Sequence, residues 1–209
     1  MMRLYYAETL HPRKACAVAR YLGSPVDFIR LDLGRGEHRT PQFLAMNPNG
    51  KVPVLEDGVR TLWESTAIMC YLSESAKSDL WPHDERQIDV LRWLSWDASC
   101  FTRSAGTLYF EYIIKPQFGI EAASAAELEQ ATESFVSYAR VLNHHLSSRK
   151  FLVGEALTVA DFAAAVTLPY ADAAQLPLGA FPEIERWHER LCELSAWREP
   201  FPDAASARG

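Results

Sequence analysis

The residues best placed to do chemistry lie in one stretch, 47–58, which reads Asn-Pro-Asn-Gly-Lys-Val-Pro-Val-Leu-Glu-Asp-Gly. Its Asn-Pro and Asn-Gly pairs predict turns, and Asp57-Gly58 is a strong hairpin signal. Pro53 stands within a short apolar strand, where proline is confined to edges, strand starts or bulges. An X-Pro bond in such a place is a candidate for a cis peptide. We therefore predict a rigid corner whose backbone N–H and C=O groups can pair with an extended peptide.

The composition of the chain excludes some classes of binding partner. A formal net charge of −6 argues against a nucleic-acid partner, which requires a basic face. No apolar run approaches the roughly 18 residues that span a bilayer, so no membrane partner is expected. The N-terminus, Met-Met-Arg-Leu-Tyr-Tyr, resembles a strand and lacks the apolar core of a signal peptide. We expect a cytoplasmic protein.

The four cysteines, at positions 16, 70, 100 and 192, are far apart and contain no C-x-x-C pair. This spacing favours buried small apolar residues in a reducing compartment over a disulfide framework or a metal site. No metal is expected.

Seven elements are predicted in the first 76 residues. They are strands at 3–7, 26–33, 52–56 and 59–62, and helices that begin at Pro12, Thr40 and Glu64. A parallel βαβ half followed by an antiparallel ββα half is the thioredoxin-like arrangement. The fold class is therefore α/β plus all-α, with a thioredoxin-like N-terminal domain (βαβαββα).

The rest of the chain is predicted to be helical. Residues 77–86 are polar and broken by proline, which is typical of a linker. A long helical pattern over 87–115 and an apolar stripe from Leu128 to Leu146 follow. Thr158-Val-Ala-Asp161 matches a helix capping box. The predicted domains are thus 1–76 and an all-helical 87–209.

These pieces resemble the cytosolic glutathione transferase superfamily over essentially the whole length. The resemblance rests on the first strand, Gly36-Glu-His38, the Asn-Pro-x-Gly-x-Val-Pro segment, Glu64-Ser65 and the capping box. The Gly-Glu-His loop resembles the bacterial, phi-like branch, in which a hydroxyl residue rather than a tyrosine activates the thiol. The resemblance implies glutathione as co-substrate, a hydrophobic electrophile as the second substrate, and a homodimer.

The resemblance also implies roles for the residues of the predicted corner. Val52, before a cis-Pro53, would pair with the cysteinyl backbone of glutathione. Ser65 at a helix start would bind the γ-glutamyl carboxylate, and Glu64 would meet the ammonium. Three cationic or potentially cationic side chains would face the glycyl carboxylate: His38, Arg39 and Lys51. A plain helix cap at Glu64-Ser65 and a solvated loop at His38-Arg39 remain open alternatives.

The thiol-activating residue is less clearly marked. Thr9 falls where phi-like relatives carry their catalytic serine, and His11 occupies a neighbouring polar position. Having threonine in place of serine departs from the family pattern, so Thr9 and His11 both stay candidates, and the alternative that neither activates the thiol remains open. Arg13 and Lys14 follow in the first helical turn, where cations oppose the helix dipole and suggest that an anion binds nearby. The alternative is that both are exposed, solvated basic side chains.

Three aromatic residues of the long helical pattern are candidates for the electrophile pocket: Trp96, Phe101 and Tyr109. Aromatic residues at helical spacing are also typical of a core. The predicted function is a glutathione transferase, with glutathione peroxidase activity as a further possibility. The alternatives are a non-catalytic binding module of the same fold and a glutathione-dependent isomerase or dehalogenase.

Overall fold

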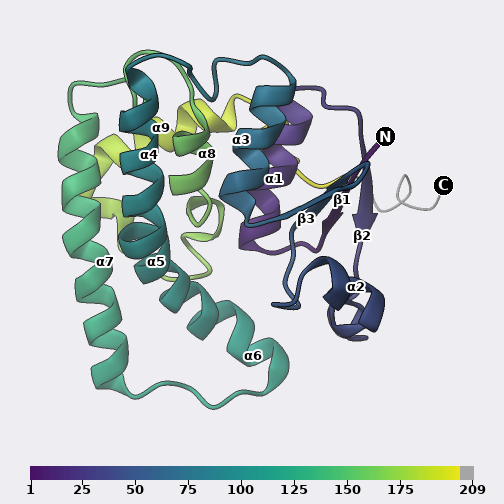
Figure 1. Cartoon of the computed structure of the whole chain (residues 1–209). Helices are drawn as coiled ribbons and strands as arrows, with labels where there is room; N and C mark the ends of the chain where they lie inside the picture. The colour runs from purple at the N-terminus through teal and green to yellow at the C-terminus, as the bar shows by residue number, and fades with distance from the viewer. Residues whose placement is uncertain (203–209) are drawn as a thin grey trace. The chain divides into compact units, whose positions relative to one another are not determined.

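The computed structural model describes residues 1–202, and the tail at 203–209 lies outside the described residues (Figure 1). The chain divides into two compact units. One comprises Met1–Pro82 and the segment from Cys192 onward, and the other comprises His83–Leu191.

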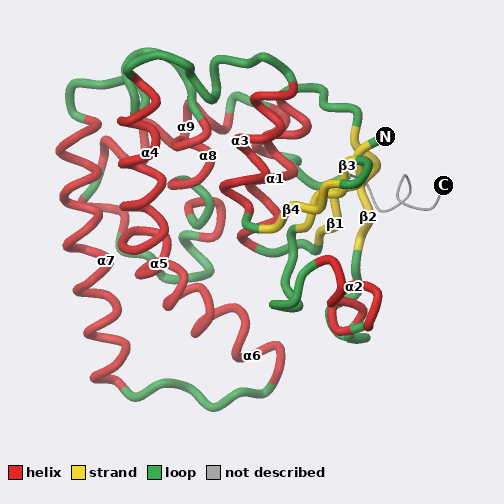
Figure 2. Tube along the Cα trace, viewed as in Figure 1, coloured by secondary structure: helices red, strands yellow, loops and turns green. Residues whose placement is uncertain are grey.

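The first unit contains a four-stranded mixed sheet in the order β2-β1-β3-β4 (Figure 2). Its strands are β1 (Met2–Tyr6), β2 (Val26–Arg30), β3 (Val54–Asp57) and β4 (Arg60–Trp63). β1 pairs with β2 in parallel and with β3 antiparallel, and β3 pairs antiparallel with β4. The predicted thioredoxin-like fold is confirmed.

Helices α1 (Leu10–Tyr21) and α3 (Ser65–Ser75) pack against each other beside this sheet (Figure 1). The buried face of α1 is built from small residues at 15–19, which allow close approach of the two helices. Ile68, Met69 and Leu72 form the corresponding face of α3. The short η1 (Glu37–Arg39) and α2 (Pro41–Met46) connect β2 to β3.

The segment from Cys192 packs on α1 through α10 (Ser195–Arg198). The Arg13 guanidinium donates to the carbonyl of Trp197 at 2.6 Å and lies 5.1 Å from the centre of the Trp197 ring. Further along, Phe201 stacks on Tyr6 with ring centres 5.6 Å apart. The predicted limits of 87–209 assign this segment to the helical domain, whereas these contacts join it to the first unit.

The second unit is entirely helical over the described residues. Its α-helices are α4 (Arg86–Trp96), α5 (Thr102–Tyr109), α6 (Lys115–Phe118), α7 (Ala125–Leu146), α8 (Val159–Ala164) and α9 (Pro182–Cys192). The predicted helix over 87–115 is one run interrupted by two π-helical turns, η2 (Asp97–Phe101) and η3 (Phe110–Ile114). Short 3-10 turns at Leu168–Tyr170 and Leu178–Ala180 precede α9. Among the described helices, none is long and apolar enough to cross a membrane.

The predicted capping box at the start of α8 organises the core of the second unit. Asp161 is completely buried, and its carboxylate accepts hydrogen bonds from four donors. These are the Leu152 and Thr158 backbone N–H groups at 2.9 Å, the Trp187 indole N–H at 3.0 Å and the Thr158 hydroxyl at 3.2 Å. One side chain therefore joins the loop before α8 to α8 and α9.

Replacing Asp161 with alanine is expected to lower the free energy of unfolding by about 3 kcal/mol or more, because buried donors lose their acceptor. Urea unfolding followed by circular dichroism measures the loss. The exposed capping box of α7, in which Glu127 accepts from the Ser124 N–H, supplies the control. Glu127→Ala should cost only about 1 kcal/mol. Equal losses for the two variants would contradict the organising role of Asp161.

Candidate functional site

The first unit contains a polar pocket of about 190 Å³. It lies where the loop before β3, the start of α3 and the start of α1 meet. Its lining residues are His11, Asn47, Asn49, Lys51, Val52, Pro53, Glu64 and Ser65. The structure thus brings together six of the residues predicted from sequence. Thr9, His38 and Arg39 do not line it, and Asn47 and Asn49 are additional.

At Val52, the wall of the pocket presents backbone N–H and C=O groups that make no backbone hydrogen bond. The Val52–Pro53 peptide bond is cis, as predicted. Within the described part of the chain, neither the N–H nor the C=O of Val52 bonds to another backbone group. Both groups are therefore available to an extended ligand beside the end of β3.

The loop that leads to Val52 is fastened by the Asn47 side chain, which is 3% exposed. Its amide N–H₂ donates to the carbonyl of Lys51 at 2.7 Å, and its carbonyl oxygen accepts from Asn49 at 3.1 Å (backbone) and 2.9 Å (side chain). Gly50 has a φ of +58°, and a Cβ there would lie 3.3 Å from the carbonyl oxygen of His38. Glycine thus lets this loop pack against the His38 loop.

The opposite wall is the start of α3. Ser65 is its first residue and is 4% exposed. Helix N-termini present N–H groups without intrahelical partners, and they favour bound carboxylates. Glu64 precedes the helix with a φ of +74° and a ψ of +114°. A non-glycine residue in this region costs about 1–3 kcal/mol and is typical of ligand-binding sites.

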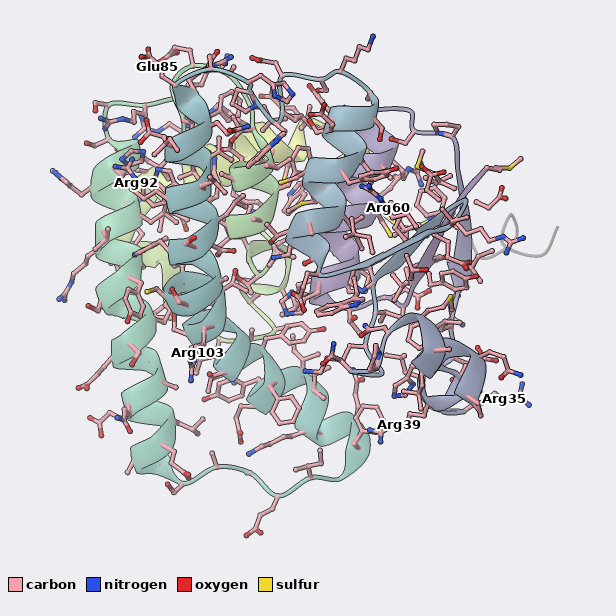
Figure 3. The ribbon with its side chains drawn as sticks, viewed as in Figure 1. Arg35, Arg39, Arg60, Glu85, Arg92 and Arg103 are labelled. Carbon is pink, nitrogen blue, oxygen red and sulfur yellow. The ribbon has the colours of Figure 1, made fainter. Side chains whose placement is uncertain are left out.

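His38 and Arg39 lie in η1, next to the pocket loop rather than in its lining. The Arg39 guanidinium donates to His38 Nε2 at 3.3 Å, and His38 Nδ1 is buried without a partner among the described residues. The Arg39 side chain is exposed at the surface of the first unit (Figure 3). Their predicted role in binding stays a prediction.

His11 is the residue of α1 that lines the pocket. Burial and the charges of Lys14 and Lys51 together lower the pKa of His11 from its ordinary 6.5 to about 4, and burial is the largest cause. The residue as a whole is exposed, but protein atoms surround much of the ring, and each of these causes favours its neutral form. The imidazole is therefore uncharged at neutral pH and stands in a positive field.

Thr9 is the N-cap residue of α1, but its side chain makes no capping hydrogen bond. The Thr9 carbonyl accepts the first hydrogen bond of the helix, from the Arg13 N–H at 3.1 Å. The hydroxyl is thus left for another partner.

The two cations predicted to lie near a bound anion differ in their contacts. Lys14 is 3% exposed and lowers the pKa of His11. Arg13 instead donates to the carbonyl of Trp197.

The three aromatic residues predicted for the electrophile lie in the second unit. Phe101 is fully buried between Trp96 and Phe135, with ring centres 5.8 and 5.5 Å apart. Tyr109 is buried edge-on to Tyr170, and burial raises the pKa of Tyr109 to about 12. Trp96 is partly exposed and lines a groove of about 540 Å³. Arg92, which is labelled in Figure 3, lines the same groove. Phe101 and Tyr109 thus pack as core residues of this unit.

The pocket carries no marks of a metal site. Among the residues that the structure describes, no three His, Cys, Asp or Glu side chains cluster closely enough to hold an ion. Together, the thioredoxin-like sheet, the cis-proline corner and the helix N-terminus form a candidate site for an extended peptide ligand that carries a carboxylate.

Comparison with known proteins agrees with this class. The glutathione S-transferase N-terminal domain family matches residues 3–74, and the C-terminal domain family matches residues 102–195. Glutathione S-transferase 3 of Zea mays is 30% identical over 97% of both chains. The chain belongs to the cytosolic glutathione transferase superfamily and resembles its phi class.

Solved structures extend the comparison. A glutathione S-transferase-I bound to lactoylglutathione is 25% identical, with a TM-score of 0.86 over 98% of this chain and 99% of that one. A transferase from Phanerochaete chrysosporium in complex with oxidized glutathione is 28% identical, with a TM-score of 0.85 over 99% and 97%. A possible glutathione S-transferase from Rhodopseudomonas palustris is 26% identical, with a TM-score of 0.82 over 100% and 98%.

The neutral state of His11 can be tested by NMR titration of its ring. The midpoint should lie near 4, well below the ordinary 6.5. Lys51→Met should raise it by removing a nearby positive charge, whereas Lys77→Met, outside the pocket, should not. A wild-type midpoint near 6.5 would show that the ring is ordinarily hydrated.

The same shift has a consequence for stability. The pKa of His11 is lower in the folded state than in the unfolded chain, so the unfolded chain binds a proton first as the pH falls. The contribution of His11 to the free energy of unfolding is therefore complete above pH 6.5 and is lost as the pH falls toward 4. His11→Gln should therefore weaken the decline of unfolding free energy over this window.

Proposed function

We propose that the protein is a glutathione transferase, which binds glutathione in the pocket of the first unit and directs its thiolate at a hydrophobic electrophile. The observation that carries the proposal is the composition of that pocket. Unpaired strand-like backbone, a helix N-terminus, a carboxylate and a cation line a single cavity of about 190 Å³. Glutathione has a group to match each of them.

The ligand's three residues are assigned accordingly. Val52 pairs with the cysteinyl backbone through its N–H and C=O, and Pro53 holds the corner. The Ser65 hydroxyl and the first N–H groups of α3 bind the γ-glutamyl carboxylate, while Glu64 binds the ammonium. Lys51 attracts the glycyl carboxylate, and His38 and Arg39 on the neighbouring loop extend the positive field.

Stabilising the thiolate is the chemical task, since a free thiol has a pKa of about 8.5 and reacts as its anion. Lys14 and Lys51 already disfavour a proton on His11, and their field favours an anionic sulfur for the same reason. A neutral His11 with so low a pKa is too weak a base to retain the thiol proton. Its ring or the unused Thr9 hydroxyl therefore acts as a hydrogen-bond donor to the thiolate.

Relatives support glutathione as the co-substrate. One similar transferase is bound to lactoylglutathione and another to oxidized glutathione. By analogy with the family, the protein is a cytoplasmic homodimer, and no metal takes part. Trp96 is the predicted electrophile residue with an exposed surface, whereas Phe101 and Tyr109 act through packing.

The first experiment is retention on glutathione resin, followed by turnover of a generic aryl halide and of cumene hydroperoxide. Binding with turnover of either substrate is expected. Binding without turnover would favour a non-catalytic module or a glutathione-dependent isomerase or dehalogenase. Failure to bind glutathione at all would overturn the proposal. The Ser65→Ala variant is compared with the wild type and should be retained more weakly on the glutathione resin.

Thr9→Val tests the thiolate donor. If the Thr9 hydroxyl donates to the sulfur, the variant should raise the pKa of bound glutathione by about one unit or more, because a charge-assisted hydrogen bond is lost. Ultraviolet titration of the thiolate measures this shift, and Thr9→Ser should restore the wild-type value. If Thr9→Val titrates like the wild type while His11→Ala is shifted, the donor is His11.

A further inference from the structure

A buried asparagine, Asn47, lines the pocket but is not among the residues expected to touch glutathione. Asn47 ends α2, and its backbone N–H donates to the Phe43 carbonyl at 2.9 Å. The amide side chain then turns toward the following loop, where it makes three further hydrogen bonds. The Asn47 carbonyl accepts from the Gly50 N–H at 2.9 Å. The side-chain amide and the backbone carbonyl of Asn47 are thus used to shape residues 47–51.

The orientation of the Asn47 amide follows from its partners. Its N–H₂ group faces the Lys51 carbonyl oxygen, and its oxygen faces the two N–H donors of Asn49. Rotating the amide by half a turn would set oxygen against oxygen and N–H₂ against N–H. The network therefore allows one orientation, and this orientation fixes the Lys51 carbonyl.

Fixing the Lys51 carbonyl also aims the N–H of Val52. The two groups belong to one peptide unit, which is planar and trans, so they point in opposite directions. Since Asn47 holds the carbonyl at 2.7 Å, rotation of this peptide is prevented. The Val52 N–H, which has no backbone partner in the described chain, is consequently held toward the opposite side.

We infer that Asn47 is a positioning residue for glutathione, acting through the Lys51–Val52 peptide to aim the Val52 N–H at the cysteinyl carbonyl of the ligand. The inference rests on the proposed function, because it assumes that glutathione pairs with Val52. It assigns Asn47 to binding and not to the chemical step. Neither the thiol donor nor the electrophile is reached through this peptide.

The test compares Asn47→Ala with a matched asparagine in the second unit. Asn143 also uses its amide oxygen structurally, accepting from the Glu183 N–H at 2.9 Å and the Ile184 N–H at 3.3 Å. Both variants lose structural hydrogen bonds, but only the first frees the Lys51 carbonyl. Calorimetry with glutathione should show a Kd about tenfold higher for Asn47→Ala, the loss expected for one well-aimed hydrogen bond. For Asn143→Ala, the Kd should change less than about twofold.

Kinetics and NMR separate positioning from general loosening. In Asn47→Ala the KM for glutathione should rise while kcat at saturation stays within about twofold of wild type. The Val52 amide proton should shift downfield on glutathione binding in the wild type and much less in the variant. Asn47→Asp, which keeps the acceptor but sets a carboxylate oxygen against the Lys51 carbonyl, should behave like alanine. It replaces Asn47→Ala if the latter does not fold.

The outcomes are distinct. Wild-type protein that fails to bind glutathione overturns the proposed function together with this inference. Wild-type protein that binds, with equal Kd changes in the Asn47 and Asn143 variants, overturns the inference alone. The same holds if Asn47→Ala lowers kcat with an unchanged KM.

Discussion

A protein that pairs its backbone with that of an extended peptide must leave some of its own backbone N–H and C=O groups without internal hydrogen bonds. Most buried backbone N–H and C=O groups in proteins are hydrogen-bonded internally. Here the unpaired groups belong to Val52, at the entrance to β3. Proline at position 53 contributes no N–H, so the strand ladder starts only after it. The surrounding loop must then be rigid without using the Val52 groups. That rigidity comes from the hydrogen bonds of Asn47, from the close packing at Gly50 and from α2, none of which uses the Val52 groups.

Charge is organised around the same pocket by burial. Burial of the ring, with smaller contributions from the charges of Lys14 and Lys51, keeps His11 neutral, so a cationic field exists beside an uncharged histidine. Arg13, one position before Lys14, is instead committed to the carbonyl and ring of Trp197. Two adjacent basic residues of one helical turn therefore serve different purposes. One contributes to the site, and the other attaches the C-terminal segment to α1.

The order of elements and six of the eight residues that line the pocket could be predicted from sequence because their signals are local. Turn dipeptides, a proline within an apolar strand and a Glu-Ser helix start each lie within a few residues. The role of Asn47 could not be predicted, although the residue belongs to the same motif, because its partner is a carbonyl four residues away whose direction depends on the fold. The burial of Phe101 and the attachment of Trp197 to Arg13 depend on contacts distant in sequence. Periodicity alone does not report them.

In the proposed function, the residues that bind glutathione and the residues that activate its thiol lie in different segments of the chain. In the proposed assignment, the residues between Asn47 and Ser65 recognise a peptide with two carboxylates, and their signals are strong because backbone geometry demands particular residue types. The segment from Thr9 to Lys14, at the start of α1, would supply the field and the hydrogen-bond donor, which many residue types can provide. His11 lines the pocket, whereas Thr9 does not, although the Thr9 hydroxyl makes no hydrogen bond to its own helix. Both therefore remain candidates for the donor. They differ in that burial and two nearby lysines keep the His11 ring neutral, so the ring can donate to an anion without acquiring a charge of its own.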